Sequence, residues 1–159
     1  MRIIAIALIA LAMPVFAQAA SPAERDGWRV HKTPHAFSDL VKRLNDAVKA
    51  EKMGLVTRAS ASAGAKNQGY TIPGNMIVGV YRNDFARRML EASVAAGIEA
   101  PIRFYLTEDD DGTSTLSYKM PSTVFAPYME EGGEALAALA SELDGVFATI
   151  AQRAVSGKN

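Results

Sequence analysis

Histidine is the first side chain to consider for acid–base or metal chemistry, and the chain has two, His31 and His35. On a helix, residues four apart would face the same metal ion. Here Pro34 separates the two histidines, and His31 falls in a predicted strand, where four residues span about 13 Å. We therefore expect no metal site. His35 lies just before a predicted helix, whose N-terminus disfavours imidazolium, so a neutral His35 is a candidate general base or ligand-binding residue.

A second pair of candidates, Arg82 and Asn83, ends the apolar segment 76–82 and begins a predicted helix. Backbone amides at a helix N-terminus can hold an anion, and Arg82 would add positive charge. The alternative is structural, with Asn83 or Asp84 capping the helix and the arginines lying at the surface. Both interpretations are kept.

A β-hairpin is predicted where residues 102–108 and 113–120 alternate on either side of Asp110-Asp111-Gly112. A two-residue turn would place Phe104 opposite Lys119. We instead expect a three-residue loop with Gly112 in the left-handed conformation, because that register gathers the apolar side chains on one face. Its pairs are Ile102 with Met120, Phe104 with Tyr118, and Leu106 with Leu116.

The other face of this hairpin is polar with one aromatic ring, and it presents its side chains from a rigid strand pair. Arg103 and Tyr105 are therefore candidate ligand-binding residues. The face carries Arg103, Tyr105, Thr107, Thr115, Ser117 and Lys119.

Several other chemistries are excluded or not supported. The absence of cysteine excludes a thiol nucleophile, an iron–sulfur cluster and a cysteine-bound zinc. The acidic run Glu108–Asp111 lacks the ligand spacing of an EF-hand and indicates a solvated turn. The nucleophile-elbow, zinc-protease, Walker and dinucleotide-binding motifs are also missing. We assign no catalytic residue and expect no metal or cofactor.

The elements that position these residues follow from apolar spacing. Strands are expected in the hairpin and at 28–33, 55–62 and 76–82. Helices are expected over 37–53 and from 83 or 84 to 97. A loop is expected at 61–75 and could hold one helical turn. The element order is β-α-β-β-α-β-β-α. We predict an α+β fold with a single small sheet of about five strands, mixed or antiparallel, and two or three packed helices.

The strongest helix is predicted at 133–155. Its apolar stripe is continuous, and Gly145 within it could cause a break at a cost of about 1 kcal/mol relative to Ala. The stripe is expected to pack on the sheet; the alternative is that part of it forms the seam of a homodimer. Its members are Leu136, Leu139, Leu143, Val146, Phe147, Ile150 and Ala154.

The first 19 residues have the pattern of a secretory signal, in which Arg2, an apolar run and Ala17-x-Ala19 follow one another. Cleavage is expected after Ala19; the alternative is an uncleaved anchor, against which Pro14 and Gln18 interrupt the run early. We predict a periplasmic or secreted protein, with no membrane attachment after cleavage.

Charge and length exclude further classes. The 159 residues carry 17 basic and 17 acidic side chains, and removing residues 1–19 deletes one arginine, leaving a net charge of −1. A general affinity for nucleic acid needs a basic excess, so none is expected. The length suits one domain, over 20–159.

The chain resembles the domain of unknown function 302 family, small α+β domains found mainly in bacteria and archaea. The resemblance covers residues 28–127, with the C-terminal helix beyond it, and implies the fold and a capacity to dimerise rather than an activity. The family commonly has Phe-Gly-Asn-Pro after the central strand, where this chain has Tyr81-Arg82-Asn83-Asp84. The matching motifs are Thr33-Pro34-His35-Ala36-Phe37, Met76-Ile77-Val78, Pro101-Ile102-Arg103, Glu108-Asp109-Asp110-Asp111-Gly112 and Ser117-Tyr118-Lys119-Met120-Pro121.

Three functions remain compatible with the sequence. The favoured one is a non-enzymatic exported binding or accessory module for a small-molecule or protein partner, using the Arg103–Tyr105 face or the Tyr81–Asn83 turn. The second is a small enzyme whose acid and base groups assemble around His35 in three dimensions. The third is a dimeric structural or interaction protein joined through the C-terminal helix.

Overall fold

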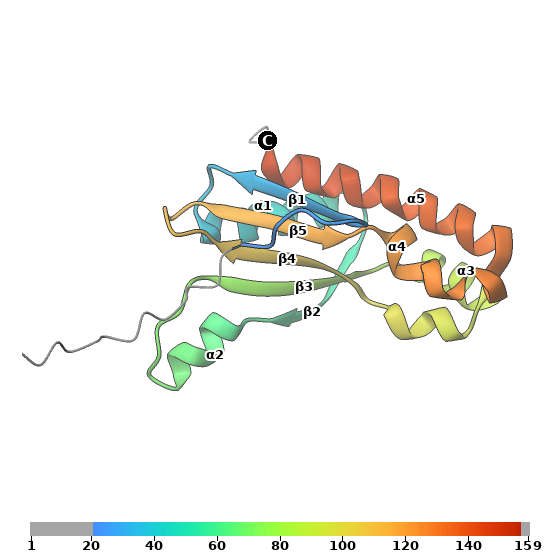
Figure 1. Ribbon diagram of the computed structural model, residues 1–159, viewed down its shortest axis with the longest axis horizontal. Coiled ribbons are helices and arrows are strands. Elements are labelled where there is room, and N and C mark those ends of the chain that lie inside the picture. The colour runs from blue at the N-terminus through green and yellow to red at the C-terminus, as the bar shows by residue number, and fades with distance from the viewer. Residues whose placement is uncertain (1–20, 157–159) are drawn as a thin grey trace, which may run out of the picture.

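The computed structural model of the chain describes residues 21–156, so the predicted leader and its cleavage site after Ala19 lie outside the described residues. The fold is α+β, as predicted. One sheet has the strand order β1-β5-β4-β3-β2, and every neighbouring pair is antiparallel (Figure 1). The strands are β1 (Trp28–Thr33), β2 (Gly54–Ala59), β3 (Asn75–Tyr81), β4 (Ile102–Glu108) and β5 (Ser114–Lys119).

Helices connect and cover these strands. The α-helices are α1 (Phe37–Ala50), α2 (Ala61–Asn67), α3 (Asn83–Ala92), α4 (Pro121–Phe125) and α5 (Met129–Val155), and two short 3₁₀ helices are η1 (Ala95–Glu99) and η2 (Ala126–Tyr128). In Figure 1, α1 lies behind the sheet, α5 runs along its upper edge beside β1, and the opposite face of the sheet is turned toward the reader. None of the helices within residues 21–156 is long and apolar enough to cross a membrane.

The core lies between the sheet and the pair α1 and α5, because strand alternation sends every second side chain of β4 toward those helices. Phe104 and Tyr118 meet Phe147 of α5, with ring centroids 4.6 Å and 5.6 Å from it. Full burial of each such side chain contributes about 1.5–3 kcal/mol. This packing covers one face of the sheet and leaves the opposite face without a helix layer of α1 and α5.

The hairpin has the predicted register, with Leu106 opposite Leu116 and Phe104 opposite Tyr118. Gly112 has φ +80°, and its amide donates to the Asp109 carbonyl at 3.0 Å, which closes the turn. The expected pair of Ile102 with Met120 is not part of the ladder, because β5 ends at Lys119. The Met120 amide instead donates to the Gly27 carbonyl at 2.8 Å.

The segment expected as a loop over 61–75 contains α2, which is longer than one turn. Ser60 caps this helix, since its hydroxyl accepts the Ala63 amide at 3.1 Å. Three alanines in seven residues supply the helix propensity. The helical turn allowed for in this segment is therefore a helix of 7 residues, and the remainder up to β3 is the expected loop.

The start and end of α3 also differ from prediction. The N-cap is Arg82, and neither Asn83 nor Asp84 caps the helix with its side chain. The helix ends at Ala92 rather than near Gly97, because Ser93 is extended and its hydroxyl accepts the Ala96 amide to begin η1. Asp84 occupies the first turn, where its charge complements the helix dipole.

Helix α5 contains the predicted C-terminal helix, and its regular part begins after Gly133, where φ is +54°. Gly145 does not interrupt it. Most of the apolar stripe is buried in the core of the same chain, including Leu136, Leu143 and Ile150. The residues predicted as a dimer seam are thus already covered by α1 and the sheet, and the homodimer itself stays a prediction.

Candidate functional site

The five residues predicted from sequence lie in three separate places. His35 is next to the C-terminal end of α5, Arg82 and Asn83 are at the β3–α3 junction, and Arg103 and Tyr105 project from β4 on the sheet face away from α1 and α5. The structure therefore brings only the last two together in one hollow.

The His35 side chain forms a hydrogen bond at the C-terminal end of α5. Its Nε2 lies 3.1 Å from the Val155 carbonyl, so Nε2 carries a proton and donates it. Arg43 donates from Nε to the neighbouring Ala154 carbonyl at 2.8 Å. The two side chains thus satisfy carbonyls that a helix C-terminus leaves without partners.

A polar groove of about 440 Å³ beside His35 is lined by acidic and basic side chains of α1 together with Arg153. Two of its cations are already engaged: Arg43 bonds Ala154, and Arg153 pairs with Glu51 at 2.9 Å. The third, Lys42, lies on α1 between Asp39 and Asp46, so the groove has mixed charge and both of its arginines are already engaged.

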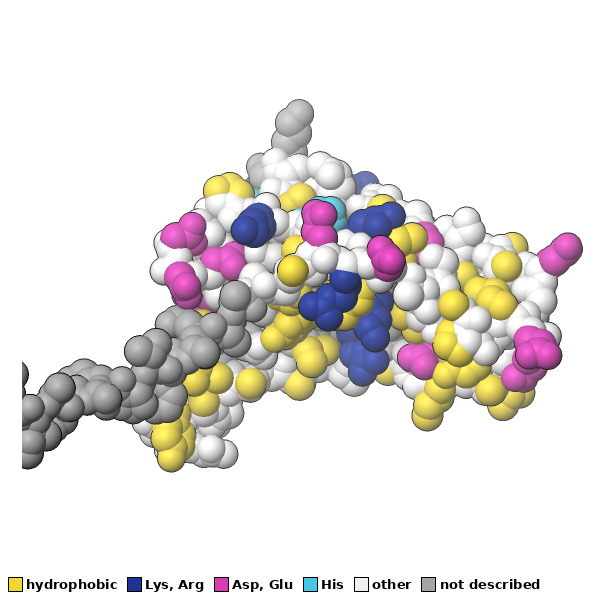
Figure 2. Space-filling model, viewed as in Figure 1, with side chains coloured by type: hydrophobic (Ala, Val, Ile, Leu, Met, Phe, Trp, Pro, Cys, Tyr) yellow, Lys and Arg dark blue, Asp and Glu magenta, His cyan; other side chains and the backbone are white. Residues whose placement is uncertain are grey.

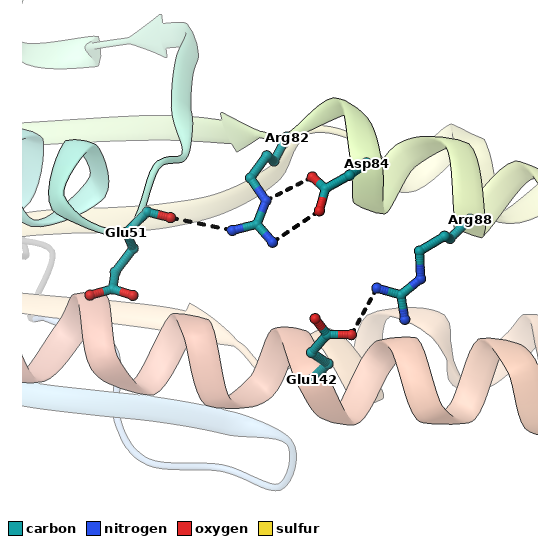
Figure 3. A network of polar contacts seen from close by, with 5 residues as sticks. All are labelled: Glu51, Arg82, Asp84, Arg88 and Glu142. Carbon is teal, nitrogen blue, oxygen red and sulfur yellow. Dashed lines mark hydrogen bonds and ion pairs between the residues drawn. The ribbon is translucent and has the colours of Figure 1, made fainter.

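At the β3–α3 junction, Arg82 is fully occupied (Figure 3). Its guanidinium holds both oxygens of Asp84, at 2.7 Å and 3.1 Å, and also donates to the Glu51 carbonyl at 3.4 Å. It stacks over the Phe85 ring at 4.1 Å. The hydrogen bond from Arg82 lowers the pKa of Asp84, as do the positive charge of Arg82 and the helix amides.

The neighbouring Arg88 extends the same cluster to α5. It pairs with Glu142 at 2.8 Å and lies 5.6 Å from the Phe85 ring centroid. Asn83 is exposed beside this cluster and makes no side-chain cap. The cluster ties β3, α3, the end of α1 and α5 together, which supports the structural interpretation of Arg82.

The open face of the sheet carries Arg103 and Tyr105, because their neighbours Phe104 and Leu106 point into the core. The strand register pairs Gly79 with Arg103 across β3 and β4, and Lys119 with Trp28 across β5 and β1. Arg103 and Lys119 are the residues next to Phe104 and Tyr118, the last pair of the β4–β5 ladder. Figure 2 shows Lys and Arg side chains gathered near the middle of this face, with hydrophobic side chains around them.

Part of the open face is covered by the segment 21–27, which we call the N-terminal strap. It crosses the sheet in front of β4 and β5 before entering β1 (Figure 1). The Ser21 hydroxyl lies 2.6 Å from the Thr107 hydroxyl. Thr107, Thr115 and Ser117, which were predicted to share the polar face with Arg103, are buried. The accessible part of the face is thus limited to the other end of β4.

At that end lies a hollow of about 290 Å³, which we call the open-face pocket. Ile77 and Tyr105 lie on its floor, and Glu99 of η1 and Val124 of α4 bound it at the Ile102 end of β4. Its lining residues are Trp28, Asn75, Ile77, Glu99, Ile102, Arg103, Tyr105, Tyr118, Lys119 and Val124.

The charges of this pocket are unbalanced. Arg103 and Lys119 lie on adjacent strands, each one residue past the last pair of the β4–β5 ladder, and among residues 21–156 neither forms an ion pair with a carboxylate. Lys119 lies 5.7 Å from the Trp28 ring centroid, and Arg25 of the N-terminal strap lies 4.9 Å from it. Like charges in such a cross-strand pair repel, so this surface favours an anion.

Two further polar groups of the pocket are held in place. The Asn75 amide donates to the Tyr105 hydroxyl oxygen, which leaves the hydroxyl proton available for another acceptor. The Glu99 carboxylate accepts from Tyr128 at 2.8 Å, and this hydrogen bond raises the pKa of Tyr128. Glu99 is the only carboxylate in the pocket lining given above, so the basic excess remains.

Sequence reasoning missed most of this lining. Trp28 was recognised only as the start of a strand, and Lys119 only as a member of the polar hairpin face. The alternation of 28–33 contained a usable signal, since pairing of that segment with 113–120 would place Trp28 and Lys119 side by side. Glu99 and Val124 carry no local pattern that would bring them to the sheet.

Carboxylates of the acidic turn Glu108–Asp111 form separate local hydrogen bonds and do not converge on one point. The Asp111 carboxylate accepts from the Thr113 amide and hydroxyl, which lowers the pKa of Asp111, and the Asp109 carboxylate accepts from Thr115 at 2.7 Å. Within residues 21–156, no group of three or more His, Asp or Glu side chains is arranged to hold a metal ion.

Comparisons with known proteins agree with this architecture. A solved structure, the crystal structure of an uncharacterised conserved protein DUF302 from Bacillus stearothermophilus, matches with a TM-score of 0.72 and 18% identity, covering 82% of this chain and 99% of that one. No curated protein matches the chain. The model of the family described as "Domain of unknown function DUF302" matches residues 29–150, which include most of α5 as well as the segment predicted to resemble it. The chain therefore belongs to the DUF302 family.

Proposed function

We propose that this protein is a non-enzymatic binding module, exported to the periplasm or the cell exterior, that holds a small organic molecule in the open-face pocket. The observation that carries the proposal is the combination of apolar floor and polar side chains in one hollow of about 290 Å³. Ligand sites are concave, mostly apolar, and contain a few placed polar groups.

The lining residues support binding better than catalysis. They include no histidine, serine or threonine, and the one carboxylate is engaged by Tyr128. Arg103, Lys119, Tyr105 and Asn75 can recognise and orient a bound molecule. The polar groove at His35 is larger, but its arginines are engaged by backbone carbonyls and Glu51, which makes it the weaker candidate.

Isothermal titration calorimetry with 2-naphthoate, 2-naphthamide and 2-naphthamidine tests the pocket, because these molecules share an apolar body and differ in charge. We expect at least one of them to bind. Ile77→Ala should weaken that binding at least fivefold, since Ile77 forms the apolar floor. Ile72→Ala is the matched control: Ile72 is exposed to a similar extent, 45% against 38%, and lies outside the pocket lining.

Two results would overturn the binding proposal. One is that none of the three molecules binds at millimolar concentration. The other is that Ile72→Ala and Ile77→Ala have equal effects, since binding would then be elsewhere on the surface.

The export part has its own test. Mass spectrometry of the full chain expressed in bacteria and recovered from the periplasm should give the mass of residues 20–159. A full-length mass in the cytoplasmic fraction alone would contradict it.

A further inference from the structure

We infer that the ligand of the open-face pocket is an organic anion, with its charged group between Arg103 and Lys119 and its apolar body over Ile77 and Tyr105. This inference rests on the proposed function and adds the chemical class of the ligand. Four observations support it, concerning charge, aromatic contacts, the place of the one carboxylate, and the distance between polar groups.

The first observation is the cross-strand pair itself. Phe104 and Tyr118 form the last pair of the β4–β5 ladder, and Arg103 and Lys119 are the next residues on the two strands and line the same pocket. Continuation of the register by one position would place their Cβ atoms about 5 Å apart. Both side chains are exposed, and no carboxylate among residues 21–156 pairs with either. A carboxylate, sulfonate or phosphate group placed between them would remove the repulsion and gain two charge-assisted hydrogen bonds.

The second observation is that a third cation reinforces the same region. Arg25 and Lys119 both lie against the Trp28 ring, at 4.9 Å and 5.7 Å from its centroid. The ring holds the two cations beside the pocket and shields one wall from water. Opposite charge is therefore attracted to the Trp28 side of the pocket.

The third observation concerns Glu99, which would repel an anion. Glu99 precedes β4 and lies at the Ile102 end of the pocket, where Tyr128 donates to it. The apolar body of an anionic ligand must therefore extend the other way along β4, toward Tyr105. Ile77 is directly opposite Tyr105 in the register and supplies the apolar surface there.

The fourth observation sets a distance. Arg103 and Tyr105 are two residues apart on one strand and face the same side, so their Cα atoms are about 7 Å apart. Because Asn75 donates to the Tyr105 oxygen, the hydroxyl proton is available for an acceptor on the ligand. The ligand class is thus a compact, apolar organic anion, and a hydrogen-bond acceptor about 7 Å from its charged group would gain an additional contact. The volume of about 290 Å³ suits one such molecule and not a polymer.

The titrations with the naphthalene series also test this inference, because 2-naphthoate and 2-naphthamidine have nearly the same shape and opposite charge. We expect 2-naphthoate to bind at least tenfold more tightly than neutral 2-naphthamide, and 2-naphthamidine to bind most weakly. The preference should decrease between 20 mM and 500 mM salt, since exposed charges are screened.

Variants identify the groups responsible. Arg103→Gln and Lys119→Gln should each reduce the preference for 2-naphthoate over 2-naphthamide several-fold, and the double variant should abolish it while retaining binding of 2-naphthamide. Lys32→Gln is the matched control, because Lys32 is an exposed β1 lysine outside the pocket lining and its loss changes the net charge equally. Circular dichroism confirms that each variant is folded.

The outcomes separate this inference from the proposed function. Equal affinity for 2-naphthoate and 2-naphthamide, with both sensitive to Ile77→Ala, would contradict the inference that the ligand is an anion. The proposal that the protein is a binding module would then still stand. A preference that persists in the double variant would place the anion elsewhere and also overturn the inference. If inorganic phosphate binds as tightly as 2-naphthoate, the inference that the ligand has an apolar body is contradicted. Failure of all three naphthalenes would overturn the proposed function itself.

Discussion

Two aromatic rings in this protein are each flanked by two cations, and they differ in how those cations are paired. At Phe85, Arg82 and Arg88 lie 4.1 Å and 5.6 Å from the ring centroid and also bind Asp84 and Glu142. At Trp28, Arg25 and Lys119 lie at similar distances, and within the part of the chain that the structure describes no carboxylate binds them.

The difference separates a structural cluster from a candidate binding surface. Phe85 is buried, and its arginines are satisfied from α1, α3 and α5, so the cluster holds elements together. Trp28 is half-buried at the edge of the open-face pocket, and its cations are directed at solvent. Similar residue types therefore serve different roles, depending on what the fold places around them.

The largest expected effect is on the Phe85 side. Phe85→Ala should reduce the free energy of unfolding by about 3–5 kcal/mol, because it removes a buried ring and leaves a cavity. Trp28→Ala should cost about 1–2 kcal/mol, since Trp28 is only partly buried, but should weaken 2-naphthoate binding strongly. Urea denaturation and calorimetry measure both. Equal losses of stability would remove the distinction between the two clusters.

The next effect compares two arginines. Arg82→Ala should destabilise the protein by about 1–2 kcal/mol, because it removes a bidentate pair with Asp84, a bond to the Glu51 carbonyl and the stacking on Phe85. Arg103→Ala should change stability by less than about 0.5 kcal/mol in either direction, since relief of repulsion from Lys119 offsets lost packing. Urea midpoints provide the comparison. A larger loss in the Arg103 variant would indicate a structural role for that arginine.

A smaller effect concerns pH and the helix-facing side of β1. Burial, with a contribution from the charge of Arg29, lowers the pKa of His31 below its usual 6.5. Its buried Nε2 has no hydrogen-bond partner within the described residues. The folded state thus binds fewer protons than the unfolded state at mildly acidic pH. The corresponding stability is present above pH 6.5 and is lost as the pH falls through the lowered pKa.

Urea denaturation at pH 7.5 and pH 5.0 tests this linkage. Wild-type protein should lose stability between the two values, and His31→Phe, which keeps a ring beside Tyr118, should lose less. A variant that shows the full wild-type loss would assign the pH dependence to other groups.

The smallest expected effect concerns the Tyr105 hydroxyl in the open-face pocket. Tyr105→Phe removes one hydroxyl and keeps the ring, so it should leave 2-naphthoate affinity nearly unchanged. It should abolish the additional affinity, about two- to fivefold, that we expect for 6-hydroxy-2-naphthoate, whose hydroxyl oxygen can accept the Tyr105 proton. Calorimetric titration of both acids against both proteins measures the difference. An additional affinity that survives in Tyr105→Phe would place the hydroxyl contact elsewhere.

The sequence by itself determined the local elements, because their causes are local. Period-two alternation and Gly112 specified the hairpin register, and the helical spacing from Leu136 to Ala154 specified the long helix that covers the core. The side to which Arg103 and Tyr105 point followed from the same alternation. Family motifs within 28–127 specified the fold class.

Only the tertiary structure decided the charged contacts between distant parts of the chain, whereas the Arg82–Asp84 pair joins residues two apart. Arg82 and Arg103 both lie at strand ends with mixed neighbours in the sequence. Arg82 meets the Glu51 carbonyl and Phe85, whereas Arg103 shares a pocket with Lys119, a second cation. These contacts depend on the antiparallel order β1-β5-β4-β3-β2 and on how η1, α4 and the N-terminal strap fold against the sheet. That order is set by burial of the whole core and not by any one segment, so no local pattern predicted the Glu51 contact of Arg82 or the place of Arg103 beside Lys119. Asp84, two residues from Arg82, was the local signal that distinguished the two arginines.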